Sequence, residues 1–144
     1  PGMTFVFQLP HSEFPANLST NRGESTMSYV DGFVVAVPSA KKTEYLEMAK
    51  LGATVFKDHG ALSVVEAWGD DVPDGKVPSF PMAVKATADE TVVFSWIVWP
   101  DRAARDAGMA AAMKDERFAA MGPDSMPFDG KRMIFGGFEM IVEA

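Results

Sequence analysis

The sequence predicts an α+β domain in which two helices pack on one face of a four-stranded antiparallel sheet. Four β-branched and aromatic segments are bounded by turn residues, and two longer segments carry apolar residues at helical spacing. These segments follow one another in the order β-α-β-β-α-β, with a short element before the third strand. A chain of 144 residues, 47% of them hydrophobic, has the size of one domain with a substantial core.

The first half of the domain supplies a strand, a helix and a second strand. Residues 29–37 are a β-branched run that ends at Pro38. Ser39 is placed to cap the following helix, and Gly60 is placed to end it. Residues 61–68 alternate and predict the second strand. The apolar positions of the helix are Tyr45, Met48, Ala49, Gly52, Val55 and Phe56.

The connection to the third strand is a turn-rich loop followed by an ambiguous segment. Residues 70–75 are rich in Asp, Pro and Gly, as turns are. Residues 79–87 fit either a short helix capped by Ser79 or a strand, and we favour the short helix. Residues 91–99 predict the third strand.

The last third supplies a helix and a strand. Asp101 caps a helix that Gly122 and Pro123 end, and residues 132–142 form the fourth strand. A stripe of small residues lets this helix lie close to the sheet. The stripe is Ala104, Ala107, Gly108, Ala111 and Ala112. Adjacent glycines inside the strand, Gly136 and Gly137, indicate a bulge or a close approach to the backbone.

This element order is that of a ferredoxin-like split β-α-β unit, and right-handed crossovers place both helices on one face. Both faces of the sheet are apolar, although an open antiparallel face should alternate with polar residues. The uncovered face therefore needs a partner, and we expect a second copy, which gives a dimeric α+β barrel. On the second strand, one face carries Leu62, Val64 and Trp68 and the other carries Val65 and Ala67. On the third strand, one face carries Val92, Phe94, Trp96 and Val98 and the other carries Val93, Ile97 and Trp99.

Composition excludes several classes of function. The absence of cysteine excludes disulfides and thiolate chemistry, and two histidines cannot by themselves build a multi-histidine metal site. A net charge of -7 argues against nucleic acid as a partner. No apolar run reaches the length of a membrane helix, and no secretory signal is recognised. We therefore expect a cytoplasmic protein that does not associate with membranes.

Residues 1–26 read as an N-terminal extension, and residues 27–144 as the barrel domain. Pro1 and Gly2 before Met3 look like an expression scar, and residues 11–26 have the composition of a linker. Residues 4–9 are mostly apolar, so we expect this arm to dock on a sheet edge or in an apolar groove.

Five segments resemble the bacterial YbaA-like family of small proteins of unknown function. They are residues 29–38 (YVDGFVVAVP), 71–76 (DVPDGK), 93–96 (VFSW), 126–133 (MPFDGKRM) and 136–139 (GGFE). The resemblance spans roughly residues 27–143 and implies a cytoplasmic dimeric α+β barrel. Relatives of that barrel include oxygenases, haem degraders, dismutases and ligand binders, so the fold leaves function open.

Glu66 is the strongest candidate for chemistry, with His59 second. Glu66 shares a strand face with apolar residues, so it is either paired with Lys131 or Arg132 or held neutral as a catalytic acid. We favour pairing. His59 lies at a helix C-terminus, where a capping or interface role is favoured over catalysis.

An aromatic set is the candidate for ligand binding, although strand aromatics are more often core. Lys131 and Arg132 could hold an anion. No metal site is predicted, because the loop with Asp70, Asp71 and Asp74 lacks the spacing of a calcium loop. We also predict no cofactor, haem included. The candidate ligand-binding residues are Trp68, Phe94, Trp96, Phe128, Lys131, Arg132 and Phe138, and Trp99 completes the aromatic set.

Two functions follow. The first is a homodimeric barrel that binds a small apolar or aromatic ligand. The alternative is a barrel enzyme, a cofactor-light monooxygenase or isomerase, that uses Glu66 or His59.

Overall fold

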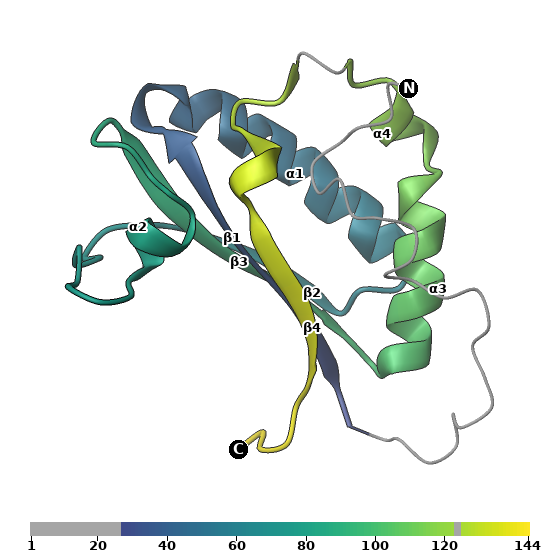
Figure 1. Cartoon of the computed structure of the whole chain (residues 1–144). Helices are drawn as coiled ribbons and strands as arrows, with labels where there is room; N and C mark the ends of the chain where they lie inside the picture. The colour runs from purple at the N-terminus through teal and green to yellow at the C-terminus, as the bar shows by residue number, and fades with distance from the viewer. Residues whose placement is uncertain (1–26, 123–124) are drawn as a thin grey trace.

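The structure is a computed structural model that describes residues 27–122 and 125–144 (Figure 1). The predicted docking of the arm at residues 4–9 lies outside the described residues, as does the linker. The elements are β1 (Tyr29–Pro38), η3 (Ser39–Lys41), α1 (Lys42–Asp58), β2 (Ser63–Trp68), α2 (Phe80–Ala83), β3 (Glu90–Trp99), α3 (Arg102–Met113), α4 (Glu116–Ala119), η5 (Gly130–Arg132) and β4 (Ile134–Glu139).

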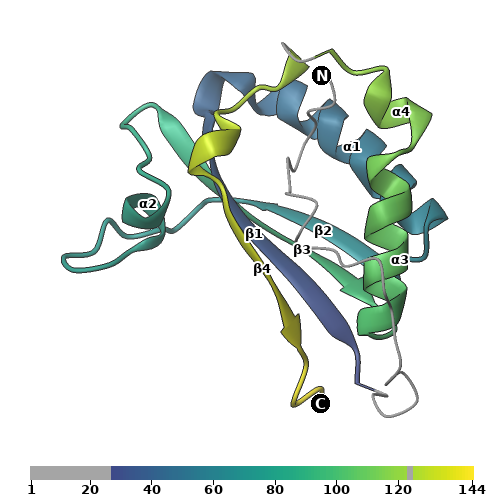
Figure 2. The same ribbon diagram turned by 45° about the vertical axis from the view of Figure 1, so that its right-hand side comes forward.

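The four strands form one antiparallel sheet in the order β2-β3-β1-β4, which confirms the predicted ferredoxin-like α+β fold. β1 and β3 are central, whereas β2 and β4 are the edges. Helices α1, α3 and α4 lie on one face of the sheet, and α2 lies beyond the other face (Figure 1, Figure 2). We call the first the helix-covered face and the second the open face.

The main core lies between α1, α3 and the helix-covered face. Every apolar position predicted for the first helix is buried in α1. The predicted cap is wrong, because Ser39 is inside the short η3 helix and no side chain caps α1. The Ser39 hydroxyl instead lies 2.6 Å from that of Thr91 on β3. The predicted stop is consistent with the backbone, since Gly60 has φ of 110°.

The second helix is shorter than predicted. Asp101 caps α3 by accepting from the Ala104 amide at 2.8 Å, as expected. The helix ends at Met113, because Asp115 caps the separate helix α4 through the Arg117 amide. Of the small-residue stripe, Gly108 makes the closest approach, since a Cβ there would overlap the carbonyl of His59 and the Trp99 ring. Ala107, in contrast, is exposed.

The fourth strand is also shorter than predicted, and it starts after the basic pair. Asp129 accepts from the Lys131 amide at 3.0 Å and begins η5, which contains Lys131 and Arg132. The glycine pair makes no bulge, because Gly136 and Gly137 pair in unbroken register with β1. The short helix favoured for the ambiguous segment is confirmed as α2, whose cap is Ser79.

Candidate functional site

The open face is apolar along all four strands, as the alternating sets predicted. Among the described residues, α2 and the segment after it cover one end of this face, where Val84 packs on Val34, Ala36 and Val92. Strand register and alternation place a common set of residues on this face. They are Val30, Gly32, Val34, Ala36, Ser63, Val65, Ala67, Val92, Phe94, Trp96, Val98, Ile134, Gly136 and Phe138.

Aromatic rings gather on this face from α2 and β3. The ring of Phe94 lies 5.8 Å from that of Phe80 and 5.4 Å from that of Trp96, measured between centroids. Phe94 is 45% exposed, and Phe138 on β4 is 61% exposed. Three predicted ligand-binding residues therefore share one accessible surface.

Two glycines leave a gap in the middle of the open face, which we call the glycine gap. Gly32 and Gly136 are direct partners across β1 and β4, and Gly32 also faces Trp96 on β3. A Cβ on Gly32 would meet no atom within 4 Å. A Cβ on Gly136 would lie 3.4 Å from the Phe138 ring. The gap therefore has backbone as its floor and Trp96 and Phe138 beside it.

The helix-covered face holds three other predicted site residues, Glu66, Trp68 and Phe128. The Tyr45 hydroxyl of α1 donates to Glu66 Oε1 at 2.6 Å. Burial raises the pKa of Glu66, and the Tyr45 hydrogen bond opposes that rise without cancelling it. The same burial, together with Glu66, raises the pKa of Tyr45. The rings of Trp68 and Phe128 lie 6.4 and 5.9 Å from that of Tyr45.

The expected pairing of Glu66 with the basic pair is wrong, because the Arg132 side chain is held elsewhere. Its guanidinium forms two hydrogen bonds with Glu90, of 2.9 and 2.7 Å, and donates to the Lys85 carbonyl at 2.6 Å. A fourth hydrogen bond reaches Asp129 at 3.2 Å. This pairing lowers the pKa of Glu90 to about 2.

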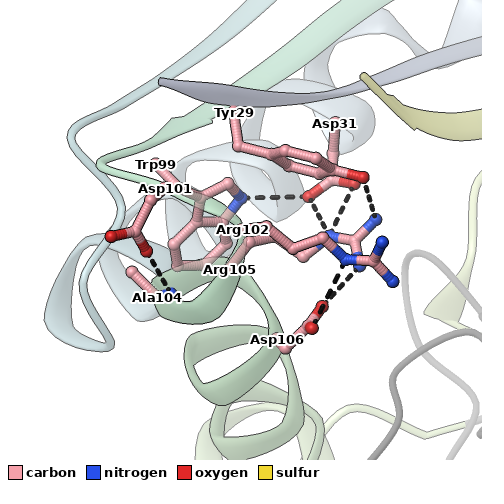
Figure 3. A network of polar contacts seen from close by, with 8 residues as sticks. All are labelled: Tyr29, Asp31, Trp99, Asp101, Arg102, Ala104, Arg105 and Asp106. Carbon is pink, nitrogen blue, oxygen red and sulfur yellow. Dashed lines mark hydrogen bonds and ion pairs between the residues drawn. The ribbon is translucent and has the colours of Figure 1, made fainter. Parts of the chain in front are cut away.

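A buried ionic network at the other end of the sheet was missed by sequence reasoning (Figure 3). Arg105 of α3 donates through Nε to both oxygens of Asp31, each at 3.1 Å, and through Nη1 to Asp106 at 2.7 Å. Trp99 Nε1 donates to Asp31 at 3.0 Å. The guanidinium also lies 4.9 Å from the centroid of the Tyr29 ring. The one available signal was a carboxylate inside an apolar strand.

Gly137 provides the space for this network. It pairs with Asp31 across β1 and β4, on the helix-covered face. A Cβ there would overlap Arg105 Nη2 and lie 2.6 Å from the Tyr29 hydroxyl oxygen. The close approach predicted from the glycine pair is therefore that of Arg105 and Tyr29.

His59 belongs to a charged cluster at the end of α1. Its Nε2 lies 2.8 Å from Asp115 Oδ2, and Arg117 bridges Asp115 and Asp58, each at 2.8 Å. These hydrogen bonds hold the pKa of Asp115 well below its usual range. The arrangement ties α1 to α4.

The sheet separates the predicted site residues into two groups. Phe94, Trp96 and Phe138 lie on the open face, whereas Glu66, Trp68 and Phe128 lie on the helix-covered face. Within residues 27–122 and 125–144, no cluster of His, Asp and Glu is suited to hold a metal ion. In that part of the chain, no helix is long and apolar enough to cross a membrane.

Comparisons with known proteins agree with the resemblance seen in the sequence. The chain is 59% identical over 117 residues to "Uncharacterized protein YbaA" of Escherichia coli K12 and of Shigella flexneri. That match covers 81% of this chain and 99% of each relative. A crystal structure described as a dimeric ferredoxin-like protein from an uncultured marine organism matches with a TM-score of 0.53 at 12% identity. It covers 82% of this chain and 99% of that one. Residues 28–130 match the model of DUF1428, described as "Protein of unknown function", and the chain belongs to this family.

Proposed function

We propose that the protein is a homodimer whose open faces lie against each other and bind a small apolar or aromatic ligand over the glycine gap. The observation that supports this most directly is the gap itself. An apolar sheet face with an unfilled backbone floor is unusual, because cores and interfaces normally fill such space with side chains. Trp96 and Phe138 beside the gap suit a flat ring.

The exposed apolar face supports the proposed dimer. None of the open-face residues named above is charged, and Ile134 and Phe138 are 44% and 61% exposed. Strands spaced about 4.8 Å apart and rising ~3.4 Å per residue give such a face roughly 500 Å² in projection. Side chains that protrude from the sheet, together with the adjoining α2, raise the area available for burial toward the value of about 800 Å² per partner in a standard interface. The structural neighbour is described as dimeric, and this supports a dimer here.

The ligand would be neutral and planar. Two apolar sheets offer it dispersion contacts and exclusion from water, with no ionic group to pair a charge. Trp96 stands next to the gap, so its fluorescence should report binding directly.

The test measures saturable binding of the neutral probe N-phenyl-1-naphthylamine, together with mass by light scattering. We expect a mass twice the chain's 15.6 kDa at micromolar concentration. In Gly32→Val, which fills the gap, we expect at least a 10-fold loss of probe affinity in a protein that remains dimeric. Gly122→Val is the matched control, because a Cβ there also meets no atom within 4 Å and lies outside the sheet.

A monomeric wild-type protein would refute the dimer. Equal probe affinity in Gly32→Val and wild type would refute the ligand site. If Gly32→Val dissociates into monomers, Gly32→Ala fills the glycine gap with a smaller side chain. Unchanged probe affinity in a dimeric Gly32→Ala would then refute the ligand site.

A further inference from the structure

Three polar groups meet on the helix-covered face where an apolar core would be expected. Glu66 on β2 accepts from Tyr45 at 2.6 Å through Oε1. Ser95 on β3 is the direct cross-strand partner of Glu66 and only 2% exposed. Its hydroxyl lies close enough to lower the Glu66 pKa, yet Oγ has no partner with hydrogen-bonding geometry among the described residues. A buried hydroxyl without a partner is rare and requires an explanation.

The electrostatics of this cluster favour a neutral acid. Burial is the largest influence on the Glu66 pKa and raises it, while Tyr45 and Ser95 lower it less. No charged side chain of the described residues contributes to that shift. A raised pKa favours the protonated carboxyl, and that is the form in which a carboxyl can act as a general acid.

The cluster can be approached from the edge of the sheet. β2 is an edge strand, and every one of its residues, Glu66 and Trp68 included, is half-buried and not fully covered. The ammonium of Lys42 lies 5.3 Å from the centroid of the Trp68 ring. The edge beside Glu66 therefore combines an aromatic face with a cation.

We propose that Glu66 is a catalytic proton donor, positioned by Tyr45, that converts a small planar enol bearing a carboxylate into its keto form. Trp68 would stack on the planar body, and Lys42 would pair with the carboxylate. Ser95, the cross-strand partner of Glu66, would help Tyr45 to orient the carboxyl. This activity does not depend on ligand binding at the open face, because the sheet lies between the two sites.

The step balances without an oxidant or reductant. The Glu66 O–H bond breaks and its proton forms a C–H bond at the enol carbon, using the electron pair of the C=C bond. The enol O–H bond breaks, and its electron pair completes the new C=O bond. Water returns the enol hydroxyl proton to the Glu66 carboxylate, so the net change is an isomerisation.

The experiment follows ketonisation of the enol form of phenylpyruvate by its ultraviolet absorbance. We expect the full-length protein to accelerate it over buffer, and Glu66→Gln to lower the enzymatic rate at least 100-fold, in the range general acids contribute. Glu47→Gln is the matched control, because Glu47 is an exposed carboxylate on the same helix as Tyr45.

Tyr45→Phe tests positioning separately from stability. Removing a hydrogen bond that lowers the Glu66 pKa should move the fall in rate to higher pH, a change that a purely structural role would not produce. Circular dichroism and thermal melting verify that each variant is folded. No acceleration by the wild type, full activity in folded Glu66→Gln, or an unshifted pH profile in Tyr45→Phe would each overturn the proposal.

Discussion

The adjacent glycines of β4 should respond very differently to the same substitution. In Gly137→Ala the new methyl would overlap Arg105 Nη2 and lie 2.6 Å from the Tyr29 hydroxyl oxygen. Because Arg105 is bound to Asp31 and is 6% exposed, its guanidinium cannot move to solvent without breaking that pair. In Gly136→Ala the nearest atoms belong to the exposed Phe138 ring, 3.4 Å away, which can rotate.

The expected magnitudes follow from these contacts. Inserting a methyl into a packed site costs about 1–3 kcal/mol, and breaking a buried ion pair costs about 3–5 kcal/mol. We therefore expect Gly137→Ala to lower the free energy of unfolding by about 2–5 kcal/mol, depending on how far Arg105 is displaced. Gly136→Ala should lie within about 1 kcal/mol of wild type, since alanine restricts the unfolded chain.

Urea denaturation followed by Trp fluorescence measures both variants. With a slope of about 2 kcal/mol/M, the midpoint of Gly137→Ala should fall by roughly 1–2.5 M. In an Arg105→Met background the cost of Gly137→Ala should drop by at least about 1 kcal/mol, because the side chain that it displaces is gone. Equal midpoints for Gly136→Ala and Gly137→Ala, or no coupling to Arg105, would refute the reasoning.

Three further predictions concern other parts of the chain. Arg132 lowers the pKa of Glu90 from 4.5 to about 2, so the Glu90–Arg132 pair stabilises the fold fully above pH 4.5 and loses this contribution as the pH falls toward 2. In Glu90→Gln, the melting temperature should therefore fall less between pH 4.5 and pH 2 than in wild type. Hemin should not bind tightly, since His59 is engaged with Asp115, and a strong Soret shift that His59→Ala abolishes would contradict this. Deleting residues 1–26 should leave the dimer intact by light scattering; a monomeric or unfolded product would make the arm part of the domain.

The fold could be predicted from the sequence because its signals are local and repeat. Alternation in the strands and 3, 4, 7 spacing in α1 each report burial on one face, and both were confirmed. The errors fall where a distant contact decides an end of an element. Asp115 ends the second helix region early because it is held by His59 and Arg117, and Arg132 stays out of β4 because Glu90 holds it.

The site was harder to predict because polar partners are a property of the fold. Glu66 was correctly placed on a buried face. Its partner Tyr45 was counted among the apolar residues of the helix, because hydrophobic spacing does not show that a tyrosine hydroxyl will need a hydrogen-bond partner. Asp31 drew no attention, because nothing near it in sequence shows that Arg105 will reach it. The glycine pair did indicate that other atoms approach the backbone closely. Only the strand register shows that Gly136 lies on the open face and Gly137 on the helix-covered face.

The central position of β1 has a consequence for how the chain folds. β1 pairs with β3 on one side and with β4 on the other, where Tyr29 meets Glu139, the last residue of that strand. The first strand of the described residues therefore lacks its β4 partner until the segment up to Glu139 has left the ribosome. Closing a loop of this length is entropically slow, and unpaired apolar edges favour association with other chains. Docking of β4 is therefore expected late, and chains truncated before it should be prone to aggregate.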